Sequence, residues 1–96
     1  MRERAIGTTG LHLSVVGLGG YEFEDDPNWT GARDVLEAAI EAGINWIDTA
    51  EAYFDGKNEE TIAAALRDVG GHVLISTKVA PAPVGTGFEP GQIRQA

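Results

Sequence analysis

Three side chains in this sequence have the types and the spacing for acid–base chemistry. Asp48 ends the apolar run 44–48, Tyr53 follows five residues later, and Lys78 ends the apolar run 72–78. An ammonium group beside a phenol favours the ionised phenol and makes tyrosine a better proton donor, while a nearby carboxylate keeps the ammonium charged. Together the three would protonate an oxygen atom of a substrate. Singly, each has an ordinary structural explanation as a loop staple, a cover over apolar surface or a solvated cation.

Two helices are predicted from hydrophobic periodicity. Apolar residues recur at intervals of three and four, the pattern of a helix with one buried face. Gly43 and Gly70 are suited to end these helices, and Asn58 is suited to cap the start of the second. The apolar stripes are Ala32, Val35, Leu36, Ala39 and Ile40 in the first helix, and Ile62, Ala65, Leu66 and Val69 in the second.

Three apolar runs, at residues 14–18, 44–48 and 72–78, alternate with these helices. Val15, Ile44 and Val73 mark them at intervals of 29 residues, close to the roughly 31 residues of one strand-and-helix unit in an eight-fold barrel. Runs without strict alternation are typical of parallel strands covered on both faces. We therefore predict an α/β fold, the first three β/α units of a (β/α)8 barrel. Such barrels place working residues at the C-terminal ends of their strands, so Asp48 and Lys78 would share one rim.

A doubly wound sheet is the main alternative, because it would begin with the same elements. It would place a glycine-rich phosphate-binding turn after the first strand. Here the run 17–20 lacks the third glycine, and four acidic residues within 22–26 follow it, where a pyrophosphate would be repelled. This acidic run is better explained as a solvated loop than as a metal site. The barrel is therefore favoured.

Further elements flank the three strands. Residues 4–13 are typical of a β-hairpin, with Gly7 and Gly10 around its turn. Pro90 suits the first position of a third helix, with Ile93 as its first apolar anchor. Three strands cannot close a barrel and would leave open edges. We therefore expect residues 1–96 to be the N-terminal portion of a single barrel domain, about three-eighths of it, with a hairpin over 1–13 and the strands and helices over 14–96.

Composition excludes several classes of function. The 96 residues carry 15 acidic and 7 basic side chains, a net charge of −8 that would repel a nucleic-acid backbone. With no cysteine, disulfides and cysteine-based zinc sites are excluded. No run of 18 apolar residues and no secretory signal pattern is present, so we expect no membrane partner and a cytoplasmic location.

Five segments, at residues 4–11, 16–20, 42–53, 58–60 and 75–78, carry a resemblance to a known family. The pattern Gly-Ile-Asn-x-x-Asp-Thr-Ala-x-x-Tyr, which ends at Tyr53, is long and specific, and Thr-Lys follows it at 77–78. On these motifs the sequence resembles the aldo-keto reductases over nearly its whole length. The resemblance implies a (β/α) barrel that reduces carbonyl groups with NADPH, or sometimes NADH, without a metal.

The resemblance also implies roles for individual residues. Tyr53 would be the proton donor, Lys78 would make its phenol more acidic, and Asp48 would pair with Lys78. Gly20 and Tyr21 match positions near the nicotinamide and the substrate, and Asp48 is expected to contact the cofactor as well.

The family's fourth catalytic residue, a histidine, would lie beyond residue 96. His12 falls in the hairpin and His72 begins the third predicted strand, and both belong at the opposite end of the barrel. No basic cluster offers an obvious site for a 2′-phosphate, so the choice between NADP and NAD stays open, as do the small carbonyl or alcohol substrate and the oligomeric state.

Two alternative functions remain. A lysine that ends a barrel strand can form a Schiff base, which would make the protein a lyase that uses Lys78. The resembled family also includes channel-associated regulatory subunits, so a non-catalytic binding role is possible on the same fold.

Overall fold

The computed structural model describes residues 1–23, 30–80 and 87–95. The acidic part of the predicted loop after Phe23 and the residues 81–86 before the third helix lie outside these ranges. Within them, strands and helices alternate along the chain as the periodicity predicts.

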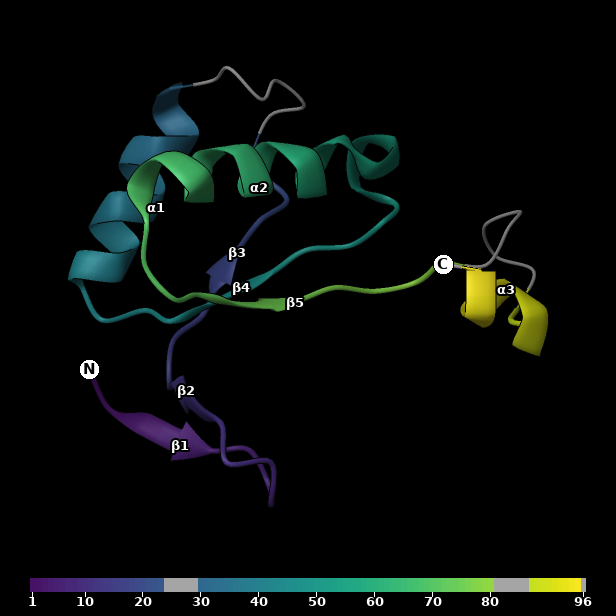
Figure 1. The fold of residues 1–96 in the computed structure, drawn as a ribbon, viewed down its shortest axis with the longest axis horizontal. Helices are drawn as coiled ribbons and strands as arrows, with labels where there is room; N and C mark the ends of the chain where they lie inside the picture. Colours follow the sequence, from purple (N-terminus) through teal and green to yellow (C-terminus); the bar gives the residue numbers. More distant parts are fainter. Residues whose placement is uncertain (24–29, 81–86, 96) are drawn as a thin grey trace.

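A three-stranded parallel sheet forms the centre of the structure. Its strands are β3 (Leu18–Gly19), β4 (Trp46–Asp48) and β5 (Leu74–Ser76), in the order β3-β4-β5. Leu18 pairs with Ile47, and Ile47 pairs with Ile75. The helices α1 (Thr30–Glu41) and α2 (Lys57–Val69) connect the strands and lie on one side of the sheet (Figure 1). Parallel strands joined by helices on one side are the repeating unit of a (β/α) barrel.

The hairpin before the sheet is also present. The strands β1 (Glu3–Ala5) and β2 (His12–Ser14) are antiparallel. Gly7 and Gly10 have φ values of 50° and 79°, which glycine adopts at little cost in a tight turn. Figure 1 shows this hairpin beyond the parallel sheet, away from both helices.

The first barrel strand lies later in the chain than predicted. Residues 14–18 were the expected strand, but Ser14 ends the hairpin and the strand begins at Leu18. Side chains of the next strand region explain the shift: Asn45 Oδ1 accepts from the Ser14 amide at 2.9 Å, and the Trp46 indole donates to the Ser14 carbonyl at 3.0 Å. The backbone of Ser14 is thereby held by side chains. The other two strands are shorter than the predicted runs, at three residues each.

The core lies between the two helices and the sheet. Leu36 and Ile62 contribute the buried faces of α1 and α2, at 1% and 2% exposure, and Ile47 of β4 meets them at 1%. The buried cluster consists of Phe23, Ala32, Leu36, Ile47, Ile62 and Ala65. The predicted stripes therefore do face the sheet, although Val35 lies at the edge with 42% exposure.

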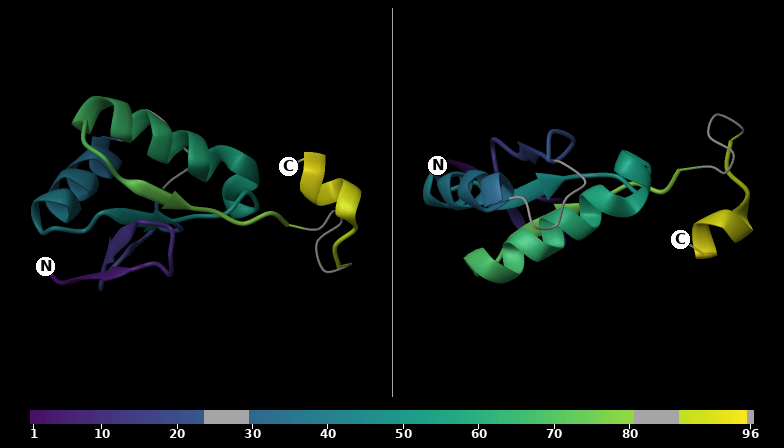
Figure 2. Two further views of the ribbon diagram at one scale, coloured as in Figure 1. Left: turned by 60° about the horizontal axis from the view of Figure 1, so that its bottom comes forward. Right: turned by 90° about the horizontal axis from the view of Figure 1, so that it is seen from above.

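The helix ends agree only in part with the sequence prediction. Gly70 follows α2 with φ 71° and donates its amide to the Leu66 carbonyl at 3.0 Å, as a C-cap does. Asn58, predicted as the N-cap, is instead inside the first turn, and Gly56 occupies the cap position. The helix α3 (Pro90–Gln95) begins at Pro90 as predicted and lies apart from α1 and α2 in both views of Figure 2, but Ile93 is 54% exposed and so is not an anchor.

Candidate active site

The carboxyl ends of β4 and β5 bring Asp48 and Lys78 together. The parallel register pairs Asp48 with Ser76, and Lys78 comes two residues beyond. The Lys78 ammonium donates to Asp48 Oδ2 at 2.7 Å and to the Thr49 carbonyl at 2.8 Å. Neighbouring parallel strands thus place a carboxylate and an ammonium in direct contact at one rim.

Each charge of this pair stabilises the other. The hydrogen bond from Lys78, helped by one from Ser76, lowers the pKa of Asp48 from its ordinary value of 3.8. In return the hydrogen bond to Asp48, with a smaller contribution from Tyr53, raises the pKa of Lys78 from 10.5. Partial burial opposes both shifts and does not reverse them. Both groups are therefore charged at neutral pH.

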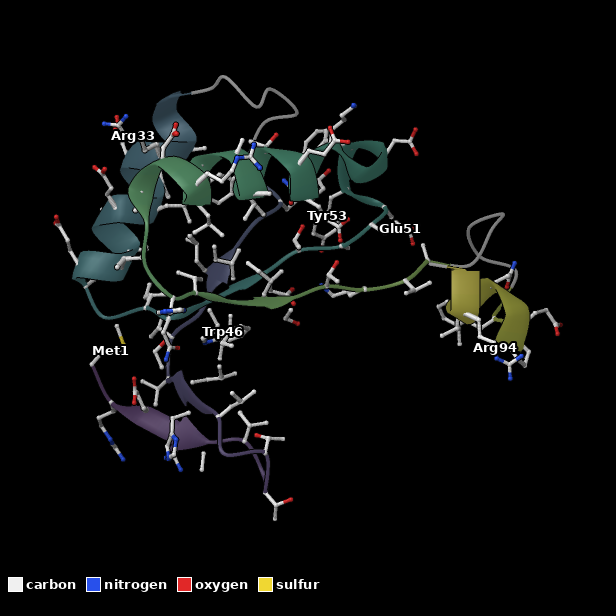
Figure 3. The ribbon with its side chains drawn as sticks, in the orientation of Figure 1. Met1, Arg33, Trp46, Glu51, Tyr53 and Arg94 are labelled. Carbon is white, nitrogen blue, oxygen red and sulfur yellow. The ribbon has the colours of Figure 1, made fainter. Side chains whose placement is uncertain are left out.

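Tyr53 lies beside this ion pair. It opens the 3-10 turn η1 (Tyr53–Gly56), and its amide donates to the Ala50 carbonyl at 3.1 Å. The Lys78 ammonium lies 5.5 Å from the centroid of the Tyr53 ring, within the range of a cation–π contact. Figure 3 shows Tyr53 and Glu51 on the loop between β4 and α2, and the Glu51 amide donates to the Lys78 carbonyl at 3.1 Å. The structure brings the three predicted side chains together, and their catalytic roles stay a prediction.

The predicted cofactor contacts, Gly20 and Tyr21, lie against the same groups. The Gly20 amide donates to the Asp48 carbonyl at 2.8 Å. A Cβ at this glycine would lie 2.9 Å from Ile62 Cδ1 and 3.1 Å from the Asp48 carbonyl oxygen, so a larger residue does not fit without movement. Tyr21 directs its ring edge-on to Tyr53, with 5.0 Å between the centroids.

The turn after Tyr53 has a strained backbone. Phe54 and Asp55 have φ values of 51° and 53°, in the left-handed region that costs a residue with a Cβ about 1–2 kcal/mol. This conformation places the Phe54 ring on Tyr21, stacked at 5.6 Å and 25°. Three aromatic rings therefore form a chain of contacts, and Lys78 lies beside one of them, that of Tyr53.

Asn58 is the part of the site that sequence reasoning missed. Its side chain is fully buried, at 0% exposure, and its amide donates to the carbonyls of Gly20 at 2.7 Å and Phe23 at 3.0 Å. Its carbonyl oxygen accepts from the Thr49 hydroxyl. Asn58 thus links two parts of the chain, the segment that contains Tyr21 and Thr49 at the end of β4. The sequence signal for this role was its place in the motif at 58–60.

Among the described residues, the other side chains with possible catalytic or metal-binding roles lie away from this site or do not cluster. His12 lies in β2 and His72 precedes β5, so both are at the other end of the parallel strands from Asp48. Among residues 1–23, 30–80 and 87–95, no three metal-binding side chains gather where they could hold an ion. None of the helices in these ranges has the length and apolarity needed to cross a membrane.

Comparison with known proteins finds a matching family and relatives of known structure. A sequence model of the Aldo/keto reductase family matches residues 15–96. An uncharacterised oxidoreductase of Bacillus subtilis, YqkF, is 40% identical over 78 residues, which is 81% of this chain and 25% of the relative. A probable voltage-gated potassium channel subunit beta of Oryza sativa is 34% identical over 83 residues, 82% of this chain and 25% of that protein.

A solved structure extends the likeness to three dimensions. It is an aldo-keto reductase of Bacillus halodurans, AKR11C1, in its holo form, with a TM-score of 0.69 and 36% identity over 95% of this chain and 28% of the solved chain. The chain thus spans about a quarter of the length of the proteins it matches. Its sheet and helices have the fold of the first three β/α units of the family's barrel, preceded by the hairpin, and the chain belongs to the aldo/keto reductase family.

Proposed function

We propose that the protein containing these residues reduces an aldehyde or ketone of a small molecule to the alcohol, with NADPH or NADH, or catalyses the reverse oxidation. The observation that supports this most is the contact of Lys78 with Asp48 at 2.7 Å and with the Tyr53 ring at 5.5 Å. In the proposal, residues 1–96 are the N-terminal portion of one barrel domain in a cytoplasmic protein, without nucleic-acid or membrane partners.

In this mechanism Tyr53 donates the proton. Its hydroxyl hydrogen passes to the carbonyl oxygen of the substrate while the carbonyl carbon accepts a hydride, so that a carbonyl becomes an alcohol and two electrons enter the substrate. The positive charge of Lys78 stabilises the phenolate that Tyr53 becomes, and Asp48 holds Lys78 in place. Solvent then returns the proton to Tyr53.

The side chains around Tyr53 fit the nicotinamide end of the cofactor. Tyr21 is 57% exposed and offers an aromatic face beside Tyr53, with the polar groups of Asp48 and Lys78 next to it. When bound, the reduced nicotinamide supplies the hydride. The Gly20 amide already donates to Asp48, and the Gly20 carbonyl already accepts from Asn58. In the proposal Gly20 therefore positions Tyr21 and makes no hydrogen bond to the cofactor.

The Schiff-base alternative fits Lys78 less well. A lysine that attacks a carbonyl must first lose its proton. The hydrogen bond to Asp48 raises the pKa of Lys78, which keeps the amine protonated. This favours an electrostatic role for Lys78 over a nucleophilic one.

A regulatory role is the second candidate. It is supported by the 34% identity to the probable potassium channel subunit beta of Oryza sativa. A regulatory subunit on this fold would bind the nicotinamide cofactor and turn over little or no carbonyl substrate.

One assay separates these functions. The full-length protein is incubated with an aldehyde and either NADPH or NADH, and cofactor consumption and alcohol formation are followed together. The proposal predicts equal amounts of both. Cofactor binding without turnover would favour the regulatory role, and borohydride trapping of substrate on Lys78 without cofactor consumption would favour the lyase.

A further inference from the structure

Glu59 reaches from α2 to the residue that precedes Lys78. Its carboxylate oxygen Oε1 accepts a hydrogen bond from the Thr77 hydroxyl at 2.5 Å, although Thr77 lies 18 residues later in the chain. Glu59 is half-buried, and it lines one hollow together with Glu51, Thr77 and Lys78. A hydrogen bond to a carboxylate is roughly twice as strong as one between neutral groups. This contact therefore ties α2 to the segment that carries the ammonium group.

Thr77 and Lys78 lie on opposite faces of the segment after β5. The Glu51 amide donates to the Lys78 carbonyl at 3.1 Å, so the pairing with the chain after β4 continues past the end of β5. Successive side chains of such a segment point to opposite faces. Lys78 contacts the Asp48 carboxylate on one face, and Thr77 contacts Glu59 of α2 on the other. Among the described residues β5 pairs with β4 alone, so the helix adds a second hold on this segment.

The position of Glu59 in its helix does not account for this contact. Glu59 and Glu60 are both in the first turn of α2, where a negative charge is favourable beside the helix N-terminus. The Glu60 carboxylate contacts Lys57 Nζ at 3.1 Å, within the same turn. The Glu59 carboxylate bonds instead to a hydroxyl next to the candidate site. The two neighbours therefore share a helix position and differ in what they contact.

We propose that Glu59 is a positioning residue for the proton transfer and that it acts through Thr77 on Lys78. The bond to Thr77 fixes the backbone beside Lys78, whose long side chain is 51% exposed and free to rotate unless it is held. The ammonium then stays on the Asp48 carboxylate and beside the Tyr53 ring. Holding a catalytic group in its reacting geometry lowers the entropy cost of the reaction. This inference rests on the proposed carbonyl reduction and adds a residue to its machinery.

The first test measures kcat and KM in the full-length protein, with propanal and benzaldehyde as probe aldehydes. Glu59→Ala and Thr77→Val each remove the hydrogen bond, so kcat should fall by roughly 10- to 10²-fold, the cost of misplacing a group by up to about 1 Å. KM for the nicotinamide cofactor should change little. Glu59→Gln keeps an acceptor and Thr77→Ser keeps a donor, so both should retain most of the wild-type kcat.

Glu60→Ala is the matched control. It removes a negative charge from the same helix turn and leaves the contact with Thr77 in place, so kcat should stay at the wild-type value. A fall in kcat as large as that in Glu59→Ala would show that the charge at the helix start matters and not the contact, and it would overturn the inference. Wild-type kcat in both Glu59→Ala and Thr77→Val would overturn it as well.

The pH profile of kcat distinguishes positioning from a simple loss of charge. A less firmly held Lys78 favours the phenolate of Tyr53 less, so the alkaline limb for aldehyde reduction should move to higher pH in Glu59→Ala. Loss of the Glu59 charge by itself would favour the phenolate and move this limb to lower pH. The other carboxylates near Lys78, those of Asp48 and Glu51, are the same in both proteins. A limb that stays in place or moves to lower pH would contradict positioning.

Titration of Asp48 by NMR tests the inference without turnover. The hydrogen bond from Lys78 is the main cause of the lowered pKa of Asp48. A loosened Lys78 should therefore raise the Asp48 midpoint in Glu59→Ala and Thr77→Val, whereas removal of a negative charge alone would lower it. Absence of aldehyde turnover in the wild type would contradict carbonyl reduction itself. An Asp48 midpoint that does not rise in either variant would overturn the role of Glu59.

Discussion

At the scale of single residues, Lys78 connects the groups of the candidate site. Its ammonium contacts the Asp48 carboxylate, the Thr49 carbonyl and the face of Tyr53. The positions of these residues could be predicted from the sequence, because parallel strands end at one rim and both Asp48 and Lys78 end apolar runs. The direct contact between them depends on the register Asp48↔Ser76, which the sequence alone does not fix.

The first prediction concerns the titration of Asp48. Because the hydrogen bond from Lys78 is the main cause of the lowered pKa, Lys78→Met should raise the Asp48 midpoint towards its ordinary value of 3.8. NMR titration of the carboxyl group checks this in the wild type and the variant. Equal midpoints in the two proteins would show that the contact contributes little in solution.

The same shifts set the pH range of the ion pair. The pKa of Asp48 is lowered on folding, so its stabilising contribution is complete above about pH 4 and is lost as the pH falls through the folded value. The pKa of Lys78 is raised, so its contribution is complete below about pH 10 and is lost as the pH rises through the folded value. The pair therefore stays intact across neutral pH.

Asn58 shows where residue-level prediction failed. An asparagine at the start of a helix is an ordinary N-cap, and the sequence predicted that role. Its actual partners, the carbonyls of Gly20 and Phe23, lie 38 and 35 residues earlier in the chain. Local pattern does not reveal such contacts, since they depend on how the segment after β3 packs on α2.

At the scale of elements, the second prediction tests the link that Asn58 makes between α2 and the segment after β3. Asn58→Ala removes three hydrogen bonds in a buried site, those that its amide donates to the Gly20 and Phe23 carbonyls and the one that it accepts from the Thr49 hydroxyl, and each lost hydrogen bond costs about 0.5–1.5 kcal/mol. We expect a large loss in the free energy of unfolding, measured by urea denaturation of the full-length protein. Thr61→Val is the control: its hydroxyl donates one hydrogen bond, to the Lys57 carbonyl of its own helix, among the residues that the structure describes, so its removal should cost much less. Similar losses in both variants would contradict a special role for Asn58.

The third prediction concerns the glycines at the end of β3. Gly20→Ala would place a methyl group against Ile62, the Asp48 carbonyl and Asn58, and should cost about 1–3 kcal/mol of stability. Gly19→Ala meets nothing within 4 Å and should be nearly neutral. Urea denaturation of both variants gives the comparison. A Gly20→Ala variant as stable as Gly19→Ala would show that the packing around Gly20 is loose.

The elements themselves were predicted best where a periodic pattern decides them. Both long helices formed over their apolar stripes, and Pro90 begins α3. The sequence predicts the first barrel strand too early in the chain, because Ser14 does lie in a strand, but in β2 of the hairpin, where Asn45 and Trp46 bind it. Local propensity does not reveal which strand Ser14 joins, since that depends on a contact between residues 31 apart along the chain.

At the scale of the whole molecule, the parallel sheet of the described residues has three strands and two open edges. β4 pairs on both sides, whereas β3 and β5 each pair on one. Large apolar side chains are exposed near these strands, among them Val15 and Val16 at 48% and 51% and Ile75 at 47%. Such edges and surfaces need further chain to cover them.

The fourth prediction follows from this geometry. Residues 1–96, expressed alone, should be marginally stable or aggregate, because the open edges and exposed apolar groups lack partners. Calorimetry and sedimentation check the state of the isolated chain. A sharp, reversible, cooperative melt of a monomer would show that the segment is a self-sufficient small fold.

The most direct test of the central claim is the turnover of Tyr53→Phe in the full-length protein. This change removes the phenolic hydroxyl and keeps the ring that contacts Tyr21 and Lys78. If Tyr53 is the proton donor, aldehyde reduction should fall by roughly 10²–10⁴-fold while the affinity for the nicotinamide cofactor stays nearly unchanged. Turnover close to that of the wild type would contradict the account and remove Tyr53 from the mechanism.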